Sequence, residues 1–183
     1  MRVPHILFAA AVLLLAASAA SAQTIEVGGN FGRGPFQYDE DKLPGGRNVV
    51  GVEACIGCDR RGVFVEYAHW GQPDVNQDAC EKYWHRTNCT TGYRSADTLA
   101  SGVRFQGRPR GRVQMFGDLG GAFGLSRYVR SSGVEGKGHA GFAGAVGATV
   151  RFDQFYVRGA GQILILSGYY VGARATAGAG WKF

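Results

Sequence analysis

The sequence predicts an all-β protein that forms an eight-stranded antiparallel up-and-down transmembrane β-barrel. Three observations lead to this prediction: an alternating last segment, seven further segments of the same kind, and no segment with a sustained 3.6-residue hydrophobic period. In residues 169–183 every second residue counted back from Phe183 is uncharged, whereas Arg174 and Lys182 lie on the opposite face. Because successive strand side chains point to opposite sides, and about 10 tilted residues cross a bilayer core, this segment is typical of a membrane-spanning strand.

The first 22 residues are predicted to be a cleaved signal peptide. Arg2 precedes an apolar run over residues 6–17, and Ala20-Ser21-Ala22 supplies small residues before Gln23. This run is too short for a transmembrane helix, and no later segment approaches the ~20 apolar residues that such a helix needs. The mature chain, residues 23–183, is then a single barrel domain.

The first four segments cover residues 25–31, 48–56, 63–68 and 99–105, and each alternates apolar with small or polar residues. Polar connections at residues 34–47 and 72–97 predict long exposed loops, and residues 58–61 predict a tight turn. The expected outward faces are Ile25, Val27, Gly29 and Phe31; Val50, Val52, Ala54 and Ile56; Val63, Val65 and Tyr67; and Leu99, Ser101, Val103 and Phe105.

The last four segments cover residues 112–125, 140–152, 155–165 and 169–183. Short connections are predicted at residues 107–110, 153–154 and 167–168, and a loop rich in serine, glycine and charge at residues 130–138. Long and short connections mostly alternate, as in barrels whose termini both lie in the periplasm. Two aromatic girdles are expected, Tyr67, Trp70, Phe123, Tyr128 and Tyr169 on the loop side and Phe152, Phe155, Trp181 and Phe183 on the turn side.

The inward faces collect the charged residues of all these segments. Eight strands leave an interior that side chains fill, so we expect a ladder of salt bridges in the lumen and no general diffusion pore. Inward Gly and Ala in the sixth and eighth segments leave a narrow ion path open as an alternative. A conductance that vanished on altering Arg158 or Arg174 would support this alternative. The expected network consists of Glu26, Glu53, Glu66, Arg104, Arg112, Asp118, Arg151, Arg158, Arg174 and Lys182.

The four cysteines follow the signal peptide as two pairs, Cys55 with Cys58 and Cys80 with Cys89. An even number in an exported chain indicates disulfides, and Cys80–Cys89 is the pair we favour. Whether Cys55 and Cys58 pair is open, because C-x-x-C also serves redox and metal sites. A zinc site would need two further ligands, and Cys80 and Cys89 have the wrong spacing for them.

The chain resembles the small bacterial outer-membrane β-barrel family, which includes the membrane domain of outer membrane protein A and porin-like and opacity-type surface proteins. The resemblance rests on the signal peptide, the eight segments and the terminal Gly180-Trp181-Lys182-Phe183. It implies outer-membrane lipid and lipopolysaccharide as surroundings. It also implies that Trp181 and Phe183 form the signal that the barrel-assembly machinery recognises.

We expect a non-enzymatic protein with a structural, envelope-integrity or surface-interaction role. Residues 72–97, stapled by Cys80 and Cys89, are the expected contact surface for an extracellular partner. The histidines lack a His-x-Ser arrangement and only a pairing of Ser167 with His69 is conceivable, so a lipid-A-modifying enzyme stays a minor alternative, as does a soluble lipocalin-like binder. No cofactor or metal is expected. The net charge of +6, which becomes +5 without Arg2, does not indicate nucleic acid, because an exported chain meets acidic lipid or polysaccharide first.

Overall fold

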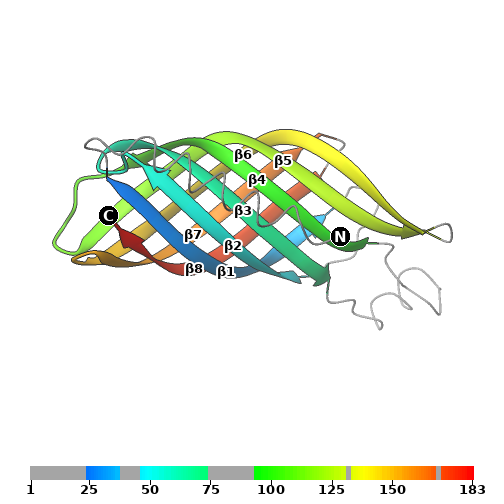
Figure 1. The fold of residues 1–183 in the computed structure, drawn as a ribbon, viewed down its shortest axis with the longest axis horizontal. Coiled ribbons are helices and arrows are strands. Elements are labelled where there is room, and N and C mark those ends of the chain that lie inside the picture. Colours follow the sequence, from blue (N-terminus) through cyan, green and yellow to red (C-terminus); the bar gives the residue numbers. More distant parts are fainter. Residues whose placement is uncertain (1–23, 38–45, 74–92, 131–132, 168–169) are drawn as a thin grey trace.

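The computed structural model describes residues 24–37, 46–73, 93–130, 133–167 and 170–183, and these residues form a closed barrel (Figure 1). Every neighbouring pair of strands is antiparallel, and the predicted fold class is confirmed. No helix among the described residues is long and apolar enough to cross a membrane. The strands are β1 (Ile25–Gln37), β2 (Gly46–Ile56), β3 (Arg61–Pro73), β4 (Tyr93–Gln106), β5 (Val113–Arg130), β6 (Gly133–Phe152), β7 (Phe155–Leu166) and β8 (Tyr170–Lys182).

The barrel closes where the first strand pairs with the last. The β1–β8 register runs from Glu26↔Lys182 to Gln37↔Val171. The Ile25 amide donates to the Phe183 carbonyl at 3.3 Å, and the Phe183 amide donates to the Ile25 carbonyl at 2.8 Å. Closure of this seam leaves no open sheet edge, and a hydrocarbon core demands this because every backbone polar group there must be paired within the protein.

The strands on the loop side are longer than the sequence predicts. The predicted loop at residues 130–138 is wrong, because the β5–β6 ladder continues up to the pair Arg130↔Gly133. Figure 1 shows this hairpin extending beyond the other strands. Likewise, residues 34–37 belong to β1, residues 46–47 to β2, and residues 93–97 to β4. Beyond the bilayer a hairpin faces water on both sides, so its strands no longer need apolar residues.

The outer wall is apolar, as the alternation predicts. Large hydrophobic side chains are widely exposed there, for example Leu119 (66%), Phe142 (71%) and Val146 (69%). The alternate residues of the same strands face inward and are mostly buried. The wall therefore suits contact with lipid, and the interior holds the polar side chains.

Two inward glycines on neighbouring strands let the backbones of β4 and β5 approach closely. Gly102 is paired with Gly120. A Cβ added at Gly102 would lie 2.2 Å from the Leu119 carbonyl oxygen, and one added at Gly120 would lie 2.1 Å from the Ser101 carbonyl oxygen. Larger side chains are therefore excluded at this point of the lumen wall.

Candidate functional site

The lumen places its acidic and basic side chains on facing walls. Glutamates come from three successive strands, Glu26 on β1, Glu53 on β2 and Glu66 on β3, and three arginines come from β6, β7 and β8 across the lumen. On the wall between them, Arg104 of β4 is paired directly with Asp118 of β5. Of the ten predicted network residues, eight lie in this interior, namely Glu26, Glu53, Glu66, Arg104, Asp118, Arg151, Arg158 and Arg174.

Two glutamates stand directly opposite each other on adjacent strands, since Glu53 of β2 is paired with Glu66 of β3. Like charges in such a pair destabilise a sheet unless other groups neutralise them. Arg158 and Arg104 both contact Glu53, whereas Arg174 contacts Glu66. Arginines from β4, β7 and β8 therefore neutralise this cross-strand pair of glutamates.

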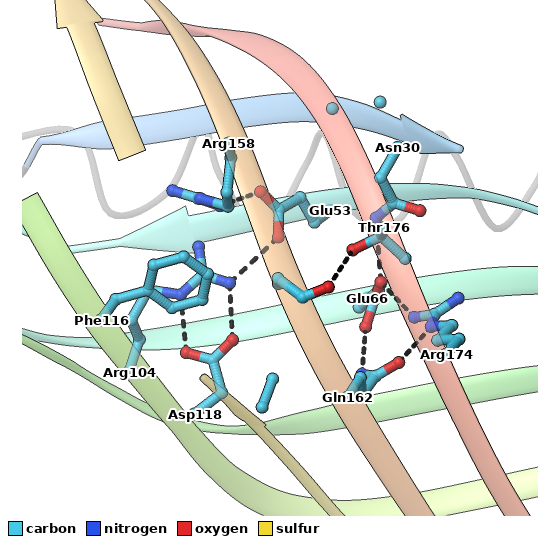
Figure 2. A pocket seen from close by; sticks show the side chains of 14 residues that line it. Asn30, Glu53, Glu66, Arg104, Phe116, Asp118, Arg158, Gln162, Arg174 and Thr176 are labelled. Atoms are coloured by element: carbon cyan, nitrogen blue, oxygen red, sulfur yellow. Dashed lines mark hydrogen bonds and ion pairs between the residues drawn. The ribbon is translucent and has the colours of Figure 1, made fainter. Parts of the chain in front are cut away.

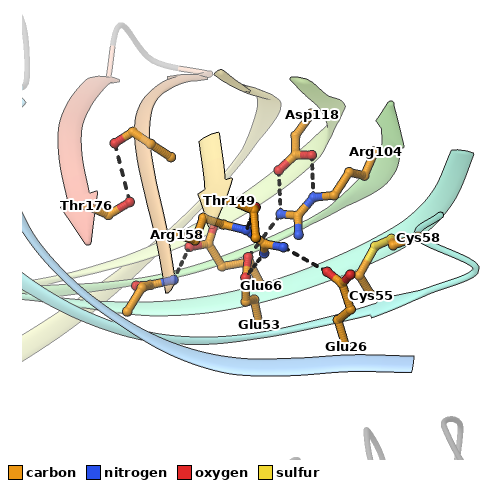
Figure 3. Close-up of polar contacts among 12 residues, drawn as sticks. Glu26, Glu53, Cys55, Cys58, Glu66, Arg104, Asp118, Thr149, Arg158 and Thr176 are labelled. Carbon is orange, nitrogen blue, oxygen red and sulfur yellow. Dashed lines mark hydrogen bonds and ion pairs between the residues drawn. A yellow bond between two sulfur atoms is a disulfide. The ribbon is translucent and has the colours of Figure 1, made fainter. Parts of the chain in front are cut away.

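The turn-side part of the network is centred on Arg158 and Arg104 (Figure 3). Arg158 bridges two glutamates: its Nη2 lies 2.8 Å from Glu26 Oε2, and its Nη1 contacts Glu53 Oε1. Arg104 donates from Nε and Nη2 to the two oxygens of Asp118, each at 2.7 Å, and from Nη2 to Glu53 Oε2 at 3.0 Å. Such bidentate charge-assisted bonds are among the strongest that side chains form.

The loop-side part of the network is centred on Glu66 (Figure 2). The Glu66 carboxylate accepts bonds from Asn30 Nδ2 at 2.9 Å, from Gln162 Nε2 at 2.6 Å and from Arg174 Nη2. Arg174 also donates to the Gln162 side chain and lies 5.3 Å over the Trp70 ring. Every partner of Glu66 thus comes from a different strand, and the carboxylate ties β1, β3, β7 and β8 together.

The ion-pair network is charge-balanced, and little space remains around it. Four carboxylates face four guanidiniums, and Phe116 lies between two of the cations, 4.7 Å from Arg104 and 4.9 Å from Arg158. A cavity of about 20 Å³ remains among Asn30, Arg104 and Arg174, which is room for a water molecule and far less than a pore requires. The arrangement therefore binds strands together and leaves no wide path for solutes at this level.

Arg112 and Lys182, the two remaining predicted members, lie outside this network. Arg112 precedes β5, and its exposed guanidinium lies 5.4 Å over the ring of Phe152 on the outer wall. Its inward parity does not direct its side chain into the lumen, because residue 112 is still in the turn before β5. Lys182 Nζ lies 2.9 Å from Asp59 Oδ1 at the turn-side mouth.

The turn between β2 and β3 closes over the turn-side mouth and is tied to both chain ends. Cys55 and Cys58 form a disulfide and are fully buried, which answers the question that the sequence left open. Gly57 takes a φ of 72°, and its amide donates to the Thr24 carbonyl at 2.8 Å. Hydrogen bonds from Thr24 and then Lys182 lower the pKa of Asp59. Cys80 and Cys89 lie outside the described residues.

The loop-side aromatic girdle is only partly where the sequence predicts it. Trp70 is wrongly assigned there: it is fully buried in the lumen, where its Nε1 donates to Thr98 Oγ1 at 3.1 Å. Its position is an even number of residues from inward Glu66, so it shares the inner face. On the turn side Phe155 lies 6.4 Å from Phe152 and 5.7 Å from Trp181. The side chains of Tyr128 and Tyr169 lie outside the described part.

Sequence reasoning missed a polar cluster on the outer wall near the loop end. Asp97 accepts bonds from Tyr67 Oη at 2.7 Å and Arg127 Nη2 at 3.1 Å, and it lies 2.8 Å from His69 Nδ1. The prediction that residue 97 ends a loop hid it, although its alternation with outward Leu99 was a usable signal. Ser167 lies beside β6, where its backbone amide donates to the Ala140 carbonyl and its own carbonyl contacts His139, and no hydrogen bond joins it to His69 among the described residues.

Among the described residues no group of three or more His, Cys, Asp or Glu side chains is arranged to hold a metal ion. The interior carboxylates are instead occupied by arginines. The polar groups of the lumen therefore form ion pairs, and these ion pairs can stabilise the barrel.

No protein-family model matches the chain, and no curated protein matches its sequence significantly. Solved structures do share its fold. Neisserial surface protein A (NspA) has a TM-score of 0.65 at 7% identity, covering 88% of this chain and 97% of that one. The attachment invasion locus protein Ail of Yersinia pestis has a TM-score of 0.57 at 17% identity with the same coverage, and OprG of Pseudomonas aeruginosa has 0.56 at 14%, covering 88% and 95%.

With its closed eight-stranded sheet, apolar wall and ionic lumen, the chain has the fold of the small β-barrels found in bacterial outer membranes. Ail has also been solved in complex with the heparin analogue sucrose octasulfate.

Proposed function

We propose that this chain is a non-enzymatic outer-membrane protein whose barrel is a rigid scaffold and whose extracellular loops contact an external partner. The observation that supports this is the filled lumen, in which three carboxylates and three guanidiniums line a cavity of about 20 Å³. Because the interior of such a barrel is closed to solutes, contacts with other molecules are made at its two ends. Structural support of the envelope and surface contact both fit this arrangement.

The loop end carries the longest connection between strands in the sequence. Residues 74–92, which contain Cys80 and Cys89, connect β3 to β4, and the β5–β6 hairpin extends further than any other strand pair (Figure 1). Arg127 and Lys137 are exposed on this hairpin. We place the contact surface in residues 72–97 and the neighbouring hairpin, because loops on a rigid barrel position binding residues while tolerating variation.

The chemical class of the partner is suggested by a fold relative. Ail was solved with a heparin analogue. Exposed Lys137 supplies positive charge that suits a sulfated glycan and Arg127, which is paired with Asp97, lies on the same hairpin, whereas residues 74–92 contain acids and bases in similar number. We therefore propose a host surface carrying sulfated glycans as the first partner to test.

The test is adherence of bacteria that display the barrel to cultured epithelial cells, with soluble heparin as competitor. Replacing residues 74–92 by a Gly-Ser linker of equal length is expected to reduce adherence at least tenfold, whereas the same replacement of residues 38–45 serves as the matched control and retains it. A shift in gel mobility on boiling verifies that each variant is folded. Unchanged adherence with residues 74–92 replaced would contradict the proposed contact surface.

A narrow channel is the second candidate, and one observation favours it. The residual cavity is lined partly by small side chains, including Gly29, Ala145, Ala160 and Gly178. Movement of a guanidinium that lines this space would widen it. Conductance that disappears on changing Arg158 or Arg174 is the signature that would distinguish this candidate from a scaffold.

A further inference from the structure

A group of five arginines lies on one side of the turn-side rim. Arg60 lies in the β2–β3 turn, Arg61 is the first residue of β3, and three more belong to the β4–β5 turn. The two turns are adjacent, since the Gln106 amide donates to the Arg60 carbonyl at 2.8 Å and the Gln114 side chain contacts the Asp59 carbonyl. All five side chains are exposed; we call Arg60, Arg61, Arg108, Arg110 and Arg112 the arginine arc.

The positive charge of the arginine arc is not balanced locally. Within the described part of the chain, none of these guanidiniums forms an ion pair with a carboxylate. Asp59, the acid in the same turn, accepts from Thr24 at 2.6 Å and from Lys182 at 2.9 Å, so it is already occupied. The lumen pairs every acid with arginine, whereas the arginines of this arc form no ion pair with Asp59, which is bonded to Thr24 and Lys182.

Two members of the arc lie against the lipid-facing wall. The Arg61 guanidinium carbon is 6.0 Å from the centre of the Phe105 ring, and that of Arg112 is 5.4 Å from the Phe152 ring. Both rings are on the outer wall, with 48% and 44% of their surface exposed. Arginines at the edge of an apolar belt bury their stems along it and hold the charged head at the level of the lipid headgroups.

We propose that the arginine arc binds the phosphate groups of anionic phospholipids in the leaflet on the turn side. Guanidinium matches phosphate through two parallel hydrogen bonds, and its charge complements the anionic headgroup. A lipid fits better than an acidic protein, because Arg61 and Arg112 lie beside the wall over lipid-facing rings. The opposite side of the barrel presents Phe155 and Trp181 to the same interface, so anionic lipid is expected to gather around β3 to β6.

The proposal is tested with the refolded mature chain in phosphatidylcholine vesicles that contain spin-labelled phosphatidylglycerol or spin-labelled phosphatidylcholine. The motionally restricted fraction gives the relative association constant of the two lipids at the barrel surface. The wild type is expected to prefer phosphatidylglycerol about threefold or more at low salt. The preference should fall toward one in ~1 M NaCl, where charges are screened beyond about 3 Å.

Substitutions locate the site. R61Q and R112Q are each expected to lower the preference by at least one third and together to abolish most of it, whereas R61K/R112K retains most of it because the charge stays. R33Q, an exposed arginine at the loop end, is the matched control and should keep the wild-type value. A shift in gel mobility on boiling reports folding of every variant.

Three results would overturn the proposal. The first is a wild type without preference for phosphatidylglycerol, which would favour an acidic protein as the partner of the arginine arc. The second is an equal loss in R33Q and R61Q, which would show that the preference is not located in the arc. The third is full loss of the preference on adding ~10 mM inorganic phosphate at constant ionic strength, which would indicate a site for free anion and not for headgroups.

Discussion

The lumen and the outer wall are built from the same strands, yet they are opposite environments. Along β7, Val157 and Ile163 are 42% and 55% exposed on the wall, whereas the intervening Arg158 and Gln162 are 5% and 7% exposed in the lumen. A soluble barrel would reverse this arrangement. The difference shows that the bilayer removes the need for an apolar core, so that the interior is free to hold charges provided they are paired.

A charged side chain therefore has a different effect on the stability of the barrel on each face. In the lumen, Arg158 contacts two glutamates and Thr149. On the wall, away from the Asp97 cluster near the loop end, a charge would face hydrocarbon. Four pairs of substitutions test this account, from the largest expected effect to the smallest.

The largest effect is expected from breaking a lumen ion pair with R104M. This change leaves Glu53 and Asp118 without their shared guanidinium, and loss of one partner of a buried pair costs about 3–5 kcal/mol. Urea unfolding in lipid vesicles, followed by the loss of heat-modifiable mobility, measures the cost. R61M, which removes an exposed arginine from the rim, is the control and should change stability by less than about 0.5 kcal/mol. Equal effects would contradict a structural role for the lumen network.

A charge placed on the wall is expected to cost slightly less. Val146 is 69% exposed near the middle of the apolar stretch of β6, and V146R should destabilise the barrel by about 2–4 kcal/mol in the same unfolding assay. V146L keeps the apolar surface and should stay near the wild type. If V146R unfolds like V146L, this part of β6 does not face hydrocarbon.

Glycine substitutions compare crowding on the two faces. G102A would place a Cβ 2.2 Å from the Leu119 carbonyl oxygen inside the barrel, and we expect a cost of about 1–3 kcal/mol. G161A lies on the wall with nothing within 4 Å of the added Cβ, and it should be neutral or stabilising by up to about 1 kcal/mol. Unfolding midpoints in urea compare the two, and a reversed order would contradict the assigned faces.

The smallest effect is expected at the turn-side mouth, from the pH response of Asp59. Its folded pKa is lowered, so its stabilising contribution is present above its ordinary value of 3.8 and is lost as the pH falls through the folded pKa. The group is exposed, so we expect less than about 1 kcal/mol.

D59N should therefore be slightly less stable than the wild type at pH 6, and the difference should shrink below pH ~4. Unfolding in urea at both pH values gives the comparison. K182Q is the matched change of its partner, and the effects of D59N and K182Q should be less than additive. A difference that grows on acidification would contradict the pairing.

The alternation of side chains made the wall predictable from sequence, because period 2 assigns each residue of a spanning strand to a face without knowledge of its neighbours. It also assigned Glu26, Arg158 and Arg174 to the lumen. What it does not contain is register. That Glu53 stands opposite Glu66, and that Arg158 reaches both Glu26 and Glu53, depends on strand stagger across the whole barrel.

The wrong sequence predictions concern the ends of strands, because residues beyond the bilayer core need not be apolar on the outer face. Arg112 has inward parity but precedes its strand, Asp97 was hidden in a predicted loop, and residues 133–138 form a ladder despite their polar composition. Trp70 was assigned by residue type and not by parity, although parity gives the right face. Alternation is therefore informative only between the points where each strand enters and leaves the bilayer.

The most direct test of the filled lumen is single-channel conductance of refolded residues 23–183 in planar bilayers, with heat-modifiable mobility as the check on folding. The charge-balanced network and the cavity of about 20 Å³ predict no conductance steps for the wild type. Discrete openings that disappear in R158M or R174M would contradict a closed scaffold and identify the lumen as an ion path.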